Sequence, residues 1–171
     1  YDSHIPLLEY YNVEKQLKQS FGKHVNIPSS KGAYLVIEHT EALHVVDVNS
    51  GNNISSANTN KTHALYVNKM AATEIARQLR LRDMGGIIVV DFIDMTDPEH
   101  RKELYEHFRE EMKRDKARHK ILPPSKFGLI QMTRQRVRPE KHIETSEENP
   151  NKDGEIIAPI VIVERMEESI R

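Results

Sequence analysis

The sequence predicts an α/β fold in which helices flank a mixed β-sheet. Three segments repeat apolar residues at the spacing of an amphipathic helix, and five short runs are rich in β-forming residues. Their order along the chain is α-β-β-β-α-β-α-β. The expected helices cover residues 9–21, 61–82 and 96–118, and the expected strands cover residues 24–27, 33–37, 41–48, 87–93 and 127–132.

The N-terminal part predicts a short helix followed by three strands. The helix is indicated by apolar residues three or four positions apart: Tyr10, Val13, Leu17 and Phe21. A turn at residues 28–32 separates the first strand from the apolar run 33–37. The run 41–48 is a further strand, and residues 50–60 form a polar loop.

The long helix over residues 61–82 carries one apolar stripe. The stripe consists of Leu65, Ala72, Ile75 and Leu79. Gly85 and Gly86 end the helix. The run 87–93 that follows is apolar without alternation, which is typical of a strand buried on both faces.

The next helix has a clear start signal. Thr96 or Asp97 can cap it, and Pro98 suits its first turn. Its core-facing residues are Leu104, Phe108 and Met112. Beyond the last strand, residues 139–155 are polar and acidic and predict a mobile linker, and residues 159–171 predict a final helix.

Length and composition limit the class of protein. The chain has 171 residues, enough for one domain with a core. It has no cysteine, which excludes disulfides, cysteine-bound zinc and thiol nucleophiles. No apolar run approaches the roughly 18–20 residues of a membrane span, so we expect a cytoplasmic protein. Because the sequence begins at Tyr1 rather than Met, we expect a fragment of a longer protein.

Charge is distributed unevenly along the chain. The net charge is −1, but residues 60–138 hold 17 basic and 11 acidic side chains, whereas residues 139–171 hold 4 and 9. Within the middle part, residues 109–138 carry 10 basic and 3 acidic side chains. This basic block predicts an anionic partner. The alternative is a solvated helix surface without a binding role.

Two strands end in the same way, with an acid after an apolar run. Asp47 follows Val45-Val46, and Asp91 follows Val89-Val90. If the two strands are neighbours, both carboxylates can point into one crevice and hold Mg²⁺ together with waters and a substrate phosphate. Asn49 can orient a carboxylate by hydrogen bonding. The alternative for each aspartate is a cap or turn acceptor, and Asp94 is equally compatible with a site residue or a helix cap.

Other catalytic patterns are missing from the sequence. The nine histidines show no metal-ligand spacing. Neither a Walker loop nor a GxGxxG motif is present, and no serine lies in a nucleophile elbow. These absences argue against nucleotide hydrolysis by a P-loop, against dehydrogenase chemistry and against a serine triad.

Four collinear segments resemble the catalytic core of the ribonuclease E/G family, of the ribonuclease G type. They are EALHVVDVNSG (41–51), EIARQLRLRDMGGIIVVDFIDM (74–95), RDKAR (114–118) and KFGLIQMTRQR (126–136). The resemblance implies a Mg²⁺-dependent endoribonuclease that hydrolyses phosphodiester bonds of single-stranded RNA in RNA processing and decay. It also implies three parts: residues 1–22 as the end of a ribonuclease-H-like subdomain, 23–138 as a deoxyribonuclease-I-like catalytic subdomain, and 139–171 as an acidic linker with a C-terminal helix.

The resemblance also implies roles for single residues. Asp47 and Asp91 match the family's metal-binding aspartates, and Asn49 matches the asparagine beside them, so these three are the expected catalytic residues. Arg118 matches an arginine associated with the 5′-monophosphate end of RNA. Within the basic block we further expect RNA contacts from Lys126, Arg134 and Arg136.

Two departures from the family pattern qualify the expectation. The family's N-terminal RNA-binding and sensor domains are missing from this sequence, so we expect this piece alone to be weakly active or inactive. The CPxCxG-type zinc link is also missing, so we expect no zinc. The expected ion, from the two aspartates and the resemblance, is Mg²⁺, with Mn²⁺ as the alternative. A homo-oligomer of the full-length protein stays open. The competing hypothesis is a non-catalytic RNA-binding or dimerisation module, suggested by the basic block and by the apolar positions of 159–171.

Overall fold

Six of the described strands form one mixed sheet in the larger of two units of the chain. The computed structural model describes residues 10–28, 30, 32–51, 60–137, 146–148 and 155–157. The larger unit covers residues 19–141, and the smaller one combines residues 1–18 with residues 142–171. These units differ from the three predicted parts, whose boundaries stay predictions.

The sheet has the strand order β1-β2-β3-β4-β6-β5. Its strands are β1 (His24–Asn26), β2 (Tyr34–His39), β3 (Leu43–Asn49), β4 (Gly86–Asp91), β5 (His119–Ile121) and β6 (Ile130–Arg134). β3 and β4 pair in parallel, whereas all other neighbours pair antiparallel. A parallel pair requires a crossover connection, and the helix between β3 and β4 in sequence provides it.

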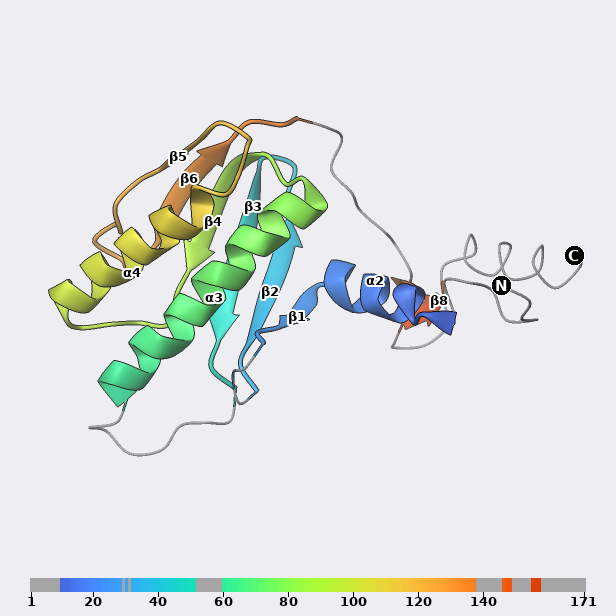
Figure 1. The fold of residues 1–171 in the computed structure, drawn as a ribbon, viewed down its shortest axis with the longest axis horizontal. Helices are drawn as coiled ribbons and strands as arrows, with labels where there is room; N and C mark the ends of the chain where they lie inside the picture. Colours follow the sequence, from blue (N-terminus) through green and yellow to red (C-terminus); the bar gives the residue numbers. More distant parts are fainter. Residues whose placement is uncertain are drawn as a thin grey trace, which may run out of the picture. The chain divides into compact units, whose positions relative to one another are not determined.

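Two helices cover one face of this sheet (Figure 1). They are α3 (Asn60–Arg82) and α4 (Pro98–Met112), and they pack against each other. All four residues of the predicted α3 stripe are buried, as are the three predicted core residues of α4. Phe92, just after β4, meets Phe108 of α4 edge to face with ring centroids 6.0 Å apart. The α/β fold class with a mixed sheet is therefore confirmed.

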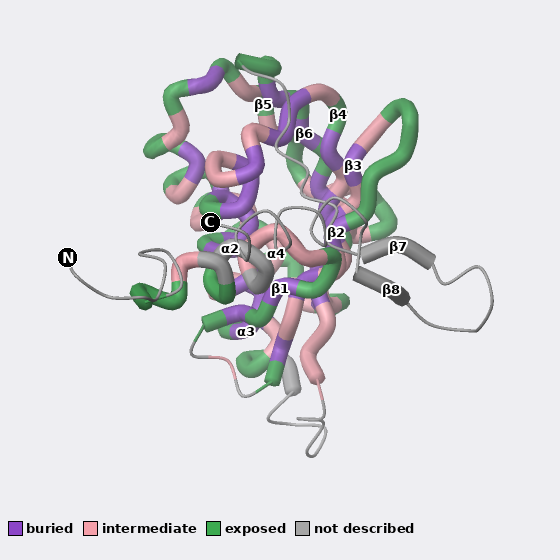
Figure 2. Tube along the Cα trace, turned by 90° about the vertical axis from the view of Figure 1, so that its right-hand side faces the viewer, coloured by how far each residue is buried: buried purple, intermediate pink, exposed green. Residues whose placement is uncertain are grey.

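The opposite face of the sheet is only half-buried. Along β3, buried residues alternate with half-buried ones, as the tube in Figure 2 also shows by its colours. In β4, Ile88 and Val90 are buried, but Ile87 is 50% exposed. The prediction that residues 87–93 form a strand buried on both faces is therefore wrong. The reason is that α3 and α4 lie on the same face, so side chains of the other face meet neither helix.

A buried arginine attaches the end of the N-terminal helix to α3. The helix α2 (Val13–Phe21) begins later than predicted. Arg82 donates hydrogen bonds to the backbone oxygens of Ser20 (3.0 Å) and Gly22 (2.7 Å). Its Nε also donates to Gln78 on α3 (2.8 Å). Because these carbonyls belong to the segment that enters β1, Arg82 fixes where the sheet begins.

Several boundaries differ from the sequence prediction. β4 ends at Asp91, and α4 ends at Met112 instead of continuing to residue 118. The three-residue strand β5 was not predicted. The segment predicted as a linker, 139–155, contains strand β7 (Ser146–Glu148), which pairs antiparallel with β8 (Glu155–Ile157). The predicted helix over 159–171 lies outside the described residues.

None of the helices that the structure describes is long and apolar enough to span a membrane.

Arg134 lies at the centre of a buried ion cluster beside the sheet. Its side chain is 4% exposed. The guanidinium donates to both carboxylate oxygens of Asp115 (2.6 and 3.1 Å), to Asp83 (3.1 Å) and to the backbone oxygen of Met84 (2.8 Å). Burial would raise the pKa of Asp115, but the hydrogen bonds from Arg134 and from the N–H of Ala117 bring that pKa below its ordinary value. The cluster joins the ends of α3 and β6 to the segment after α4.

Replacing Arg134 by Met should lower the free energy of unfolding by about 3–5 kcal/mol, because it leaves Asp115 buried without its partner. A carboxylate whose pKa is lowered by folding stabilises the fold at neutral pH and loses that effect as the pH falls through the folded-state pKa. The difference between wild type and variant should therefore shrink on acidification. Urea unfolding at several pH values measures both effects.

The matched control is Arg136→Met, because Arg136 is exposed two residues further on and should cost less than about 0.5 kcal/mol. Equal stability of wild type and Arg134→Met at neutral pH would contradict the role assigned to the cluster.

Candidate active site

Asp47 and Asp91 meet across the only parallel strand pair of the described sheet. The register pairs Asp47 on β3 directly with Asp91 on β4. Directly paired residues project to the same face, and neighbouring strands lie about 4.8 Å apart. Val46 and Val90, the preceding residues, are buried under the helices. The two carboxylates therefore leave the sheet together on the face away from α3 and α4.

Asn49 holds the Asp47 carboxylate in place. It is the last residue of β3 and lies two positions after Asp47, so both side chains share one face. Its Nδ2 donates a hydrogen bond to Oδ2 of Asp47 over 2.8 Å. This contact restricts the rotamer of Asp47 and leaves the other carboxylate oxygen for a ligand.

The electrostatics of the pair favour a bound cation. Burial raises the pKa of Asp91, and the negative charges of Asp47 and Asp94 raise it further. A divalent ion between the carboxylates would remove this repulsion. Two carboxylates suit Mg²⁺, which keeps several waters and takes further oxygens from substrate phosphate. The described residues contain no cluster of three or more His, Asp or Glu side chains arranged for a metal. Asp47 and Asp91 are the two carboxylates of this site that could hold one.

A buried amide on α3, which was not predicted from the sequence, fixes the loop after Asp91. Asn68 donates to the backbone oxygen of Ile93 (2.8 Å) and accepts from the Ile93 N–H (3.0 Å). Both contacts hold the backbone two residues beyond Asp91. The available signal was an amide within the buried part of a helix, where an unpaired polar group would be costly.

The basic residues predicted to bind RNA do not form one surface. Arg118 is exposed and lines an open hollow of about 580 Å³ near Gly86, at the start of β4. Asp91 lies at the other end of β4, five residues and about 16 Å away along the strand. Lys126 is exposed on the turn before β6, at the same end of the sheet as Asp91.

The other two predicted RNA contacts, Arg134 and Arg136, lie away from Asp47 and Asp91. Arg134 is buried and engaged by Asp115 and Asp83, so it offers no free guanidinium at the surface. Arg136 is exposed and donates from Nε to the backbone oxygen of Gly85 at 3.4 Å. The structure thus unites Asp47, Asn49 and Asp91, and it separates Arg134 and Arg136 from them.

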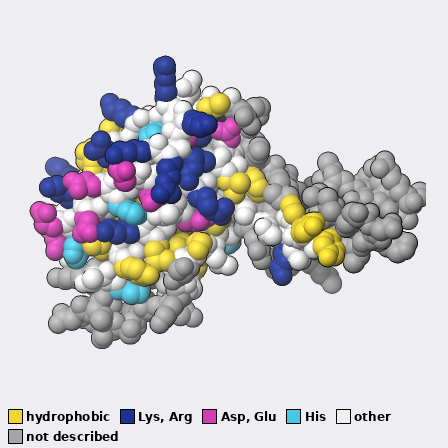
Figure 3. Space-filling model, in the orientation of Figure 1, with side chains coloured by type: hydrophobic (Ala, Val, Ile, Leu, Met, Phe, Trp, Pro, Cys, Tyr) yellow, Lys and Arg dark blue, Asp and Glu magenta, His cyan; other side chains and the backbone are white. Residues whose placement is uncertain are grey.

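The part of the basic block on α4 is a mixed-charge surface. Figure 3 shows Lys and Arg side chains among Asp and Glu side chains over this helix. Lys113 pairs with Glu110 over 2.5 Å, and Arg109 lies over the ring of Tyr105 at 5.6 Å. These residues belong to the helix-covered face, away from Asp47 and Asp91, which we call the acid pair. For α4, the geometry fits the alternative of a solvated helix surface.

Comparison with known proteins connects this geometry to a family. The profile of the Ribonuclease E/G family matches residues 1–137. The chain belongs to the ribonuclease E/G family. Among its relatives, Ribonuclease E of Escherichia coli K12 is 45% identical over 139 residues, which cover 81% of this chain and 13% of that protein. Ribonuclease E of Synechocystis is 46% identical over 132 residues, covering 77% and 19%.

A plant relative extends the comparison beyond bacteria. The chloroplastic Ribonuclease E/G-like protein of Arabidopsis thaliana is 44% identical over 140 residues, covering 81% of this chain and 14% of that protein. The chain therefore spans less than a fifth of the length of these ribonuclease E/G relatives. The aligned part is the one that carries the acid pair.

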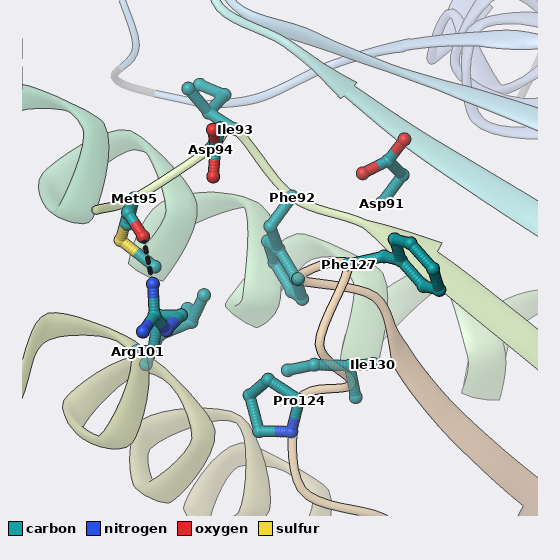
Figure 4. A pocket seen from close by; sticks show the side chains of 11 residues that line it. Asp91, Phe92, Ile93, Asp94, Met95, Arg101, Pro124, Phe127 and Ile130 are labelled. Atoms are coloured by element: carbon teal, nitrogen blue, oxygen red, sulfur yellow. Dashed lines mark hydrogen bonds between the residues drawn. The ribbon is translucent and has the colours of Figure 1, made fainter. Parts of the chain in front are cut away.

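Asp94 of this ribonuclease E/G chain is not the cap of α4. Asp97 has that role, since its Oδ1 accepts from the N–H of Glu99 over 2.9 Å. Asp94 is exposed and lines the same hollow as Asp91 (Figure 4). Of its two expected roles, the one near the site is therefore the one compatible with the structure.

Replacing Asn68 by Ala should loosen the loop after Asp91, because the N–H and the carbonyl of Ile93 lose their partners. Two hydrogen bonds of this kind contribute about 1–3 kcal/mol together. Amide hydrogen exchange should accelerate at Ile93 much more than at Ile88 within β4. Thr73→Ala is the matched control, since it removes a side-chain hydrogen bond at an exposed position of the same helix. Unchanged exchange at Ile93 in the Ala variant would show that the amide does not hold the loop.

Proposed function

We propose that this chain supplies the metal-binding catalytic part of an endoribonuclease that hydrolyses phosphodiester bonds of single-stranded RNA with Mg²⁺, in RNA processing and decay. The observation that carries the proposal is the direct pairing of Asp47 with Asp91 at the ends of two parallel strands. Family membership supports it, because the relatives above are named ribonucleases.

Each residue of the site has a separate task in this proposal. Asp47 and Asp91 would hold the ion, and Asn49 keeps Asp47 oriented through its hydrogen bond. Mg²⁺, when bound, supplies positive charge to a phosphodiester oxygen and lowers the pKa of a bound water. Asn68 holds the backbone of the loop after Asp91 through two hydrogen bonds to Ile93. Two carboxylates leave other coordination positions of Mg²⁺ open for a phosphate oxygen.

Two exposed basic residues fit a polyanionic substrate, one near the aspartate pair and one at the far end of β4. Lys126 lies at the Asp91 end of the sheet and can contact a phosphate next to the one that is cleaved. Arg118 lies at the opposite end of β4, and no hydrogen bond or ion pair holds its guanidinium within the described part of the chain. It is free to bind a terminal 5′-phosphate in a bidentate way. Mn²⁺ as the alternative ion, a cytoplasmic location and a homo-oligomer belong to the same proposal.

A second candidate function is RNA binding without catalysis. The separation of the Arg118 hollow from the acid pair favours it, because this hollow can bind phosphate independently of any metal. Such binding would weaken with salt but ignore EDTA and substitutions of the two aspartates.

Replacing Asp91 by Asn should reduce the cleavage rate of single-stranded RNA by the complete protein at least about a hundredfold, because several kcal/mol of charge stabilisation are lost. Initial rates at saturating Mg²⁺ measure the effect. Asp97→Asn is the matched control, since Asn also caps helices and the same charge is removed outside the acid pair. Cleavage that persists in Asp91→Asn, or in EDTA, would refute the metal-dependent mechanism.

A further inference from the structure

Phe127 is exposed beside the acid pair. Its side chain is 89% exposed, more than any other large hydrophobic residue that the structure describes. It lines the same hollow as Asp91, and Figure 4 shows its ring next to that carboxylate. Single exposed hydrophobic residues are common, so the location and the support of this ring decide its meaning.

The turn that carries Phe127 has a defined hydrogen-bonding pattern. The Phe127 N–H donates to Oγ of Ser125 (3.2 Å), and the Gly128 N–H donates to the backbone oxygen of Ser125 (3.0 Å). The Ser125 N–H donates in turn to the backbone oxygen of Leu129 (2.9 Å). Gly128 has a φ of +84°, a conformation that favours glycine. The ring is therefore presented by a fixed turn between β5 and β6.

The hollow beside the ring is too small to enclose a base. Its volume is about 60 Å³, whereas pockets that enclose small molecules have roughly 300–1,000 Å³. A ligand at this place must lie on the outer face of the ring. A flat aromatic group satisfies this condition, because it stacks on a ring without entering a pocket.

The surroundings of Phe127 favour a nucleic acid over a protein segment. A protein segment seated on the ring would remove water from Asp91 and Asp94, which costs free energy. A nucleotide instead brings a phosphate that the proposed metal and Lys126 can bind, and a base that covers the ring.

We propose that Phe127 stacks on a nucleobase next to the phosphodiester bond held at Asp47 and Asp91, and thereby selects unpaired RNA. The inference rests on the function proposed above and adds a substrate-binding residue to it. A base within a duplex has both faces covered by its neighbours, so it offers no face to Phe127. Stacking accepts any base, because every base has a π-face. Phe127 therefore selects the single-stranded state and not a sequence.

The test is RNA binding by the complete protein in Mg²⁺, measured by fluorescence anisotropy with a labelled, non-cleavable single-stranded RNA. Phe127→Leu keeps an apolar side chain but removes the π-face, and it should weaken binding about five- to 150-fold. Phe127→Trp should bind about as well as wild type. Tyr66→Leu is the matched control, since Tyr66 is 56% exposed on α3 and does not line this hollow.

RNAs that lack one base at a time locate the contact. For the RNA without the stacked base, Phe127→Leu should cause no further loss, whereas it should weaken binding of all the others. Duplex RNA should not distinguish wild type from Phe127→Leu. Coupling at no position, or equal loss with every RNA, would overturn the proposal. So would a change in oligomeric mass without any change in RNA binding, which would identify a protein contact instead.

Failure of the proposed function is distinguishable from failure of this inference, because binding of a non-cleavable RNA needs no cleavage. If Asp91→Asn cleaves normally while the base-specific coupling appears, the metal mechanism is wrong and the stacking contact stands. If Asp91→Asn is inactive and no coupling appears, only the stacking contact is wrong.

Discussion

The parallel pairing of β3 with β4 is the constraint on which the site depends. It places Asp47 directly beside Asp91 although the two residues are 44 positions apart in sequence. A register shift of one residue would turn one carboxylate toward the helices, into the apolar core. The helix α3, which connects the two strands, is therefore as important for the site as the carboxylates. Its buried stripe fixes the crossover, and Asn68 on the same helix fixes the loop that leaves β4.

Because the core lies on one side of the sheet, one face of the sheet stabilises the fold and the other is accessible to a ligand. α3 and α4 bury one side of the sheet, and the ion cluster around Arg134 closes the end where β6 meets α3. The side chains on the other face are half-buried or exposed, and the acid pair leaves the sheet there. This division separates the groups that stabilise the fold from the groups available to a ligand. It also explains why basic residues adjacent in sequence lie on different surfaces.

Local patterns made much of this fold predictable from sequence. The α3 stripe, the α4 core residues and the matched acids at two strand ends need only the periodicity of the elements that carry them. The two aspartates could be expected to lie side by side only if their strands were neighbours. Neither strand's sequence alone shows which strand it pairs with. β5 escaped prediction because three residues, His119–Ile121, are too few to show a period. The prediction that β4 is buried on both faces was wrong, because a continuous apolar run does not show whether helices cover one face of the strand or both.

Long-range partners explain the remaining differences. Arg134 looked like part of a basic block because its acceptors, Asp83 and Asp115, lie 51 and 19 residues away. Asn68 escaped notice because its partner, Ile93, lies 25 residues away. Neither relation has a local sequence signal. Phe127 is a further example. A lone aromatic residue in a turn carries no functional signal in the sequence, and its meaning depends on the fold, which places it beside Asp91.

The proposed divalent-cation site between Asp47 and Asp91 can be tested directly. The most direct measurement is a crystal structure of the protein soaked with Mn²⁺, with data collected at the manganese absorption edge. We expect one anomalous peak between the two carboxylates, about 2.0–2.2 Å from an oxygen of each, as for a small hard cation. The peak should disappear in Asp91→Asn. A peak at another place, or one bound to a single aspartate and unaffected by the substitution, would contradict a shared site at Asp47 and Asp91.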